Sequence, residues 1–143
     1  MKRRILLVDD DLAVLLTLKA VLEFQGFEVE TASNTPEALS RIESSIYQMV
    51  ISDLRMETQD AGLKIIRAAR RQSYDPATAL LTAYPPSGGH WEEEPSESLL
   101  IKPIGTNDLL RQLEALLVRH EDARQARRRI APAGTQASTR KAV

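Results

Sequence analysis

The sequence has 143 residues, of which 43% are hydrophobic and 27% charged, enough for one domain with a hydrophobic core but short for two. It contains no cysteine, which excludes disulfide bonds, a thiol nucleophile and a cysteine metal cluster. The net charge of -1 is unevenly distributed, because residues 1–118 carry 12 Lys and Arg against 18 Asp and Glu, whereas residues 119–143 carry 7 against 2. The body of the chain is therefore acidic and its C-terminal segment is basic.

The N-terminal segment does not resemble a targeting sequence. Its basic residues are followed by a short apolar run, residues 5–8, which three aspartates interrupt at once. A secretory signal or a membrane span needs a longer apolar stretch. We therefore expect a cytoplasmic protein that does not enter a membrane.

Strand-like and helix-like patterns alternate along the chain. Short apolar runs predict buried parallel strands, and apolar residues at helical spacing predict helices between them. The expected strands are residues 5–8, 27–31, 49–53, 77–82 and 98–101, and the expected helices begin at Leu12, Thr35, Gly62 and either Thr106 or Asp108. Right-handed crossovers join such units. The pattern predicts an α/β fold, a doubly wound five-stranded parallel sheet with helices on both faces.

The second expected helix has a clear start signal. Thr35 is the predicted N-cap, Pro36 would occupy the first helical position, and Glu37 places an acid in the first turn. Each residue type suits the N-terminus of a helix.

Two segments depart from the alternation. Residues 84–95 contain three prolines and two glycines without apolar periodicity, so the fourth helix is expected to be short or missing. From Ala131 onward the composition is typical of a disordered tail. We expect one domain over residues 1–122, followed by a basic helical extension and a tail or linker over 123–143.

Polar residues follow four of the expected strands. Asp9 and Asp10 follow the first strand, Asp53 ends the third, Thr82 ends the fourth and Lys102 follows the fifth. In the strand order 2-1-3-4-5 these residues would meet at the carboxyl edge of the sheet. Clustered carboxylates need a cation, and an all-oxygen site favours Mg²⁺. With a lysine nearby, the cluster could receive a phosphoryl group on a carboxylate.

Each of these residues also has a structural explanation. Aspartates after the first strand could favour the N-terminus of the next helix through its dipole, and Asp11, the expected N-cap, is left out of the site. Thr82 could be an ordinary strand residue. Lys102 and Pro103 could simply end a strand, because proline cannot extend the hydrogen-bonded ladder.

Four short motifs carry a family resemblance. Val8-Asp9-Asp10, Ile51-Ser52-Asp53, Leu81-Thr82-Ala83 and Ile101-Lys102-Pro103 occur in that order. Together they resemble the receiver domain of two-component response regulators, over residues 4 to about 120. The resemblance implies the flavodoxin-like strand order 2-1-3-4-5, in either a stand-alone receiver or part of a longer protein.

The resemblance implies a metal-dependent acceptor. Asp53 would take a phosphoryl group from the phosphohistidine of a sensor histidine kinase or phosphotransfer protein. Asp10, Asp53 and the backbone carbonyl of Arg55 would bind Mg²⁺, with Asp9 acting mainly through water. Arg55 could instead bridge to an acid without metal or be an exposed loop residue.

The resemblance also implies a signalling switch. Lys102 would pair with the phosphoryl group or with the carboxylate that it modifies, and Thr82 would move to donate a hydrogen bond to a phosphoryl oxygen. Such a protein is a self-phosphorylating acceptor rather than a turnover enzyme, with autodephosphorylation left open. A Mg²⁺ phosphatase is disfavoured, because Arg55 and not a second aspartate stands two residues after Asp53.

Several positions depart from the family pattern. Glu57 stands where receivers usually have proline, Gly62 comes one residue later than usual, and Leu99 replaces an aromatic residue that reports the movement of the threonine. Glu57, Leu99 and the missing fourth helix motivate an alternative to the switch, a receiver-like interaction module with weak or no phosphorylation-dependent output.

The sequence leaves the output partner open. We expect an unidentified downstream protein, and the oligomeric state, a monomer or a homodimer, is left open. Direct nucleic-acid binding is not expected, because the basic tail has the composition of a linker. His90 and Trp91 could anchor a partner or belong to a loop.

Overall fold

The computed structural model describes residues 2–83, 98–101 and 105–130. Strands and helices alternate over most of this part of the chain. The elements are β1 (Arg4–Val8), α1 (Leu12–Phe24), β2 (Glu28–Ala32), α2 (Thr35–Ser44), β3 (Met49–Asp53), α3 (Ala61–Arg70), β4 (Ala77–Thr82), β5 (Ser98–Ile101) and α4 (Thr106–Ile130).

All neighbouring strands of the sheet run parallel. The sheet has five strands in the order β2-β1-β3-β4-β5. This confirms the predicted fold class and strand order. The prediction of a short or missing helix between β4 and β5 concerns residues that lie outside the described part of the chain.

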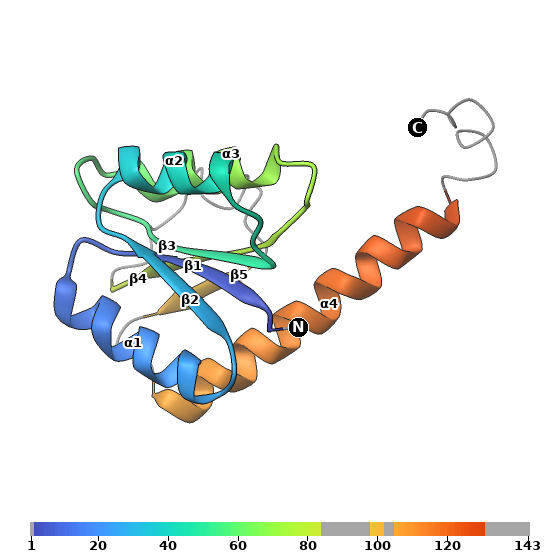
Figure 1. Ribbon diagram of the computed structural model, residues 1–143, viewed down its shortest axis with the longest axis horizontal. Helices are drawn as coiled ribbons and strands as arrows, with labels where there is room; N and C mark the ends of the chain where they lie inside the picture. The colour runs from blue at the N-terminus through green and yellow to red at the C-terminus, as the bar shows by residue number, and fades with distance from the viewer. Residues whose placement is uncertain (1, 84–97, 102–104, 131–143) are drawn as a thin grey trace.

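Helices cover both faces of the sheet, with α2 and α3 on one face and α1 and α4 on the other (Figure 1). Successive side chains of a strand point to opposite faces. Thus Ile5 and Leu7 of β1 belong to the core under α1 and α4, whereas Leu6 and Val8 belong to the core under α2 and α3. The central strands are buried on both faces, which explains their continuous apolar sequences.

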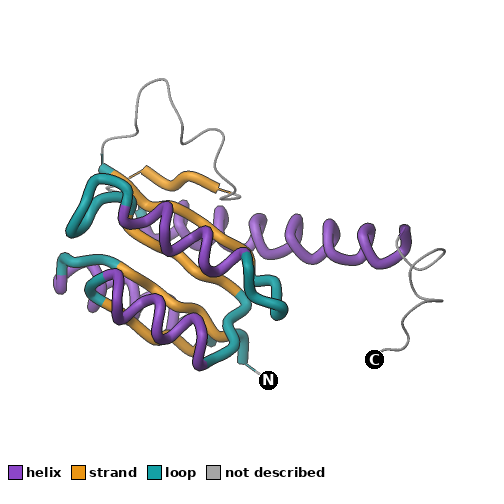
Figure 2. The backbone as a smooth tube through the Cα atoms, turned by 90° about the horizontal axis from the view of Figure 1, so that it is seen from above, coloured by secondary structure: helices purple, strands orange, loops and turns teal. Residues whose placement is uncertain are grey.

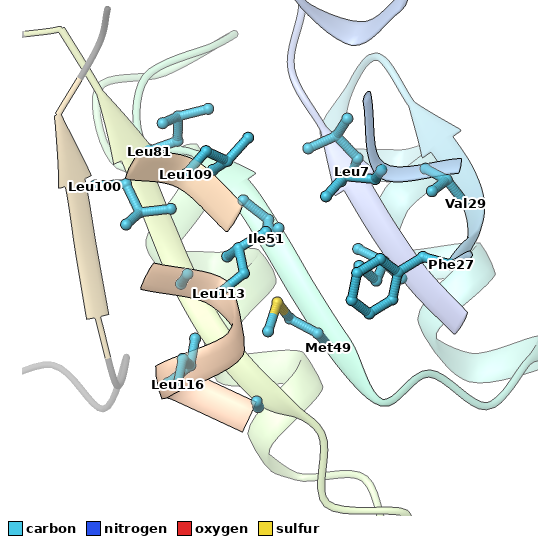
Figure 3. Packing of buried hydrophobic residues seen from close by; sticks show 14 of the residues in the cluster. Leu7, Phe27, Val29, Met49, Ile51, Leu81, Leu100, Leu109, Leu113 and Leu116 are labelled. Atoms are coloured by element: carbon cyan, nitrogen blue, oxygen red, sulfur yellow. The ribbon is translucent and has the colours of Figure 1, made fainter. Parts of the chain in front are cut away.

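Helix α4 closes the first of these two cores. Its residues Leu109 and Leu113 lie beside Ile51 of β3 (Figure 3). Their spacing puts them on one side of the helix, and both are almost completely buried.

The N-cap of α2 lies one residue earlier than the sequence suggested. The N-cap is Asn34, whose side-chain Oδ1 accepts a hydrogen bond of 2.9 Å from the backbone N–H of Glu37. The prediction of Thr35 as the cap was therefore wrong by one position. Proline is tolerated throughout the first helical turn, so Pro36 did not fix the start of the helix.

Helix α4 continues beyond the sheet, as Figures 1 and 2 show. Its distal part is held by Asp75 in the turn before β4, a residue with φ of 53°. The Asp75 carboxylate pairs with Arg127 at 2.8 Å and Arg124 at 3.5 Å, and its backbone carbonyl lies 2.8 Å from Nε2 of His120. The boundary expected after residue 122 falls inside this helix and stays a prediction.

The structure also bears on membrane insertion. Among the described residues, no helix combines the length and apolar character that a membrane span requires.

Candidate functional site

The carboxyl ends of two adjacent strands bring three aspartates together. Asp9 and Asp10 follow β1, and Asp53 is the last residue of β3, which pairs with β1. One carboxylate oxygen from each of the three lies within 4.8 Å of those from the other two. Asp9 and Asp53 are buried, whereas Asp10 is exposed. The cluster therefore has a buried floor and one side open to solvent.

Local hydrogen bonds orient the first of these aspartates. Oδ1 of Asp9 accepts a bond of 2.9 Å from the backbone N–H of Asp11. Asp11 in turn caps α1, because its Oδ1 accepts bonds from the backbone N–H groups of Ala13 and Val14. The predicted N-cap role of Asp11 is confirmed.

A close backbone approach holds the end of β3. Gly62 donates its backbone N–H to the carbonyl oxygen of Leu54 at 2.9 Å. A Cβ at Gly62 would stand 2.3 Å from the carbonyl oxygen of Asp53, a distance that a side chain cannot occupy. The sequence marked Gly62 as a helix start and as a glycine displaced by one residue from the family pattern, but its packing role was missed, although glycine between a loop and a helix is a known sign of close approach.

Thr82 lies near the same edge of the sheet. It ends β4, is buried, and directly follows Leu81, which pairs with Asp53 in the register of β3 and β4. Lys102, which follows β5, lies outside the described residues. Of the five polar residues predicted to meet, the structure brings the three aspartates together. The strand register places Thr82 near them.

The loop between β3 and α3 contains Arg55 and Glu57, both exposed. Glu57 accepts two hydrogen bonds from Thr35, from the backbone N–H at 2.7 Å and from Oγ1 at 2.8 Å. Loss of hydration would raise the pKa of Glu57, but the bonds from Thr35, with the backbone N–H of Glu57 and the charge of Lys64, together lower it. Glu57 is thus an ionised group that links this loop to α2. It is not among the carboxylates that meet at Asp53.

The donor set suits a hard divalent cation. Three carboxylates at this separation repel one another unless positive charge lies between them. Carboxylate oxygens with an open, solvated side match the preference of Mg²⁺ for a few protein oxygens plus water. The residues present therefore fit the Mg²⁺ that the sequence predicted.

Comparison with known proteins gives matches over the same region. The family described as the response regulator receiver domain matches residues 5–114. The transcriptional regulatory protein CpxR homolog of Haemophilus influenzae is 33% identical over 121 residues, which cover 81% of this chain and 51% of that protein. The response regulator MprA of Mycobacterium bovis is 35% identical over 130 residues, covering 88% and 56%. The chain thus spans about half the length of these relatives.

Solved structures share the fold. A CheY-like receiver domain protein from Methanospirillum hungatei has a TM-score of 0.75 and 26% identity, over 86% of this chain and 99% of that chain. The response regulator TrrA of Thermotoga maritima, in complex with Mg(2+)-BeF, has a TM-score of 0.68 and 30% identity, over 80% and 98%. Given the strand order, the aspartates at its carboxyl edge and a family match over most of its length, this chain belongs to the response regulator receiver domains.

Proposed function

We propose that this receiver accepts a phosphoryl group on Asp53, in a Mg²⁺-dependent reaction, and acts as a phosphorylation-controlled signalling switch. The observation that carries the proposal is the meeting of the Asp9, Asp10 and Asp53 carboxylates within 4.8 Å. The donor would be the phosphohistidine of a sensor histidine kinase or phosphotransfer protein.

The acidic residues would divide between holding the cation and attacking phosphorus. Asp10, Asp53 and the backbone carbonyl of Arg55 would hold Mg²⁺, with Asp9 contributing through water. When bound, the ion supplies positive charge against the phosphoryl oxygens. The likeness to TrrA, whose structure contains Mg(2+)-BeF, supports this choice of ion.

Asp53 would be the nucleophile. A carboxylate oxygen of Asp53 forms a bond to phosphorus while the phosphorus–nitrogen bond of the donor breaks, and the imidazole leaves with the bonding electron pair. Lys102 would offset the charge of the acyl phosphate, and Thr82 would donate a hydrogen bond to one of its oxygens. These two groups would stabilise the phosphorylated form.

In the proposed function, the protein acts as a switch and not as a turnover enzyme. Its signal would pass to a downstream protein. This chain would not bind nucleic acid directly. The relatives include a transcriptional regulatory protein, but this chain spans only about half of it. The cytoplasmic location stays a prediction.

Phosphorylation by a small donor tests the proposal. Incubation with acetyl phosphate or phosphoramidate and Mg²⁺ should give a phosphoryl adduct in the intact mass spectrum. The adduct should be absent in Asp53→Asn and with excess EDTA. The control variant Asp60→Asn, which changes an exposed carboxylate of the adjoining loop, should be modified like the wild type.

Two results would contradict this function. No adduct with any donor, despite a folded protein, would exclude phosphoryl acceptance. An adduct of the same yield in Asp53→Asn would move the chemistry to another residue. If phosphorylation and Asp53→Asn both leave partner affinity unchanged, the interaction module expected as the alternative would gain support.

A further inference from the structure

We propose that Glu57 is a positioning residue for the Mg²⁺ site, because it tethers the loop between β3 and α3 to the first turn of α2. This inference rests on the proposed function and assigns to Glu57 a role in the same site. It concerns how the loop is held and adds no ligand to the cation.

The tether has two points of attachment on one residue. Oε2 of Glu57 accepts the backbone N–H of Thr35 at 2.7 Å, and Oε1 accepts the Thr35 hydroxyl at 2.8 Å. Thr35 is the first residue of α2, where backbone N–H groups have no acceptor within the helix. The helix dipole also favours a carboxylate at this end. The contact is therefore charge-assisted and has defined geometry.

The tethered loop includes Arg55. Regular structure ends at Asp53 and resumes at Ala61. The bond from the Gly62 N–H to the Leu54 carbonyl joins the two ends of the loop. Inside the loop, the Met56 N–H donates to the Thr58 carbonyl at 3.0 Å. Glu57 adds an attachment in the middle, to a different element. That attachment limits the movement of the backbone between Asp53 and Glu57.

The restricted backbone carries the carbonyl group proposed for Mg²⁺. Arg55 lies midway between Asp53 and Glu57 in the sequence, so its backbone is fixed by β3 on one side and by the tether on the other. Proline at position 57 would restrict the backbone through its ring. Here two hydrogen bonds to a neighbouring helix restrict it instead. A carbonyl oxygen that is already placed loses less entropy when it binds the ion.

Mg²⁺ titration of the unphosphorylated protein by calorimetry tests the inference. Glu57→Gln, which keeps the shape of the side chain but removes its charge, should raise the Kd for Mg²⁺ by about fivefold. Thr35→Val, which removes one hydrogen bond without changing charge, should raise it by about twofold. Glu57→Pro should bind Mg²⁺ more tightly than Glu57→Gln, because the proline ring restricts the backbone at the same position. Amide exchange of residues 55–58 without Mg²⁺ should be faster in Glu57→Gln.

The control is Asp60→Asn, which removes a carboxylate from the same exposed loop. Its Kd for Mg²⁺ should stay near that of the wild type. An equal loss of Mg²⁺ affinity in Asp60→Asn and Glu57→Gln would show a general effect of charge and would contradict a positioning role of Glu57. Unchanged Mg²⁺ affinity and loop exchange in Glu57→Gln, beside normal wild-type binding, would also overturn it. A wild type that binds no Mg²⁺ would instead contradict the proposed function itself.

Discussion

Gly62 at the start of α3 packs directly against the backbone of Asp53. A Cβ added to Gly62 would lie 2.3 Å from the carbonyl oxygen of Asp53 and 2.7 Å from the Cα of Leu54. These are backbone atoms at the end of a buried central strand, so they cannot move aside as a flexible side chain would. The position of the proposed phosphoacceptor therefore depends on the absence of a side chain in a neighbouring helix.

Gly62→Ala should destabilise the protein and displace Asp53. Overpacking against backbone costs roughly 1–3 kcal/mol or more, to be measured as a loss of unfolding free energy in urea. The rate of adduct formation with acetyl phosphate should fall as well. The control is Gly105→Ala, because a Cβ at Gly105 would lie 4.0 Å from its nearest atom. This variant should lose roughly 1 kcal/mol of unfolding free energy or less. Equal stability of the two variants would contradict the packing account.

Asp10→Asn should stabilise the metal-free protein and reduce its response to Mg²⁺. Removing one of three carboxylates that meet within 4.8 Å relieves repulsion worth about 0.5–1 kcal/mol. Ligand at a hundredfold excess over its Kd stabilises a protein by about 2.7 kcal/mol, and the variant should lose most of that gain. Thermal unfolding with and without Mg²⁺ measures both effects.

Asp11→Asn is the matched control for Asp10→Asn. It makes the same charge change one residue further along, and asparagine also caps helices well. Its melting temperature should still rise with Mg²⁺ as in the wild type. A Mg²⁺ response retained by Asp10→Asn, or lost by Asp11→Asn, would contradict the assignment of the ligands.

Asp75→Asn should loosen the distal part of α4. The change removes the ion pairs to Arg124 and Arg127 while asparagine still tolerates the positive φ. Exposed ion pairs contribute about 0.2–1 kcal/mol each at most, so the main result should be faster amide exchange in residues 121–130. The difference from wild type should shrink at high salt. Arg128→Gln, at an exposed position near the same end, should leave this exchange nearly unchanged.

Tyr47 should make the protein less stable at high pH. Burial, and then its hydrogen bond of 2.5 Å to Glu30, raise the pKa of Tyr47 to about 12 from 10.0. Between these values the unfolded chain has lost the proton that the folded protein keeps, so the unfolding free energy falls as pH rises. Burial raises the pKa of Tyr74 in the same direction, also to about 12.

Urea unfolding at a series of pH values measures the contribution of these tyrosines. Tyr47→Phe should flatten the decline between about pH 10 and pH 12, and the double variant with Tyr74→Phe should flatten it further. A decline as steep as in the wild type would show that neither phenol is responsible.

Local patterns in the sequence determined most of the architecture. Continuous apolar runs indicated strands buried on both faces, and their alternation with helical patterns was enough to predict a parallel sheet. Because parallel strands end at one edge, the positions of Asp9, Asp10 and Asp53 after such runs already implied their convergence. The parallel sheet needed only periodicity and the order of elements along the chain, whereas the strand order that makes β1 and β3 neighbours came from the resemblance to receiver domains.

Contacts between distant residues could be decided only by the tertiary structure. Glu57 and Thr35 are 22 residues apart, and His120 and Asp75 are 45 apart, so no local pattern relates them. The same holds for Gly62 against Asp53, where the approach of helix to strand makes glycine necessary. The sequence alone determined the type and order of the elements through short-range propensity and burial. Their side-chain contacts were settled only when packing brought separate loops and helices to the same place.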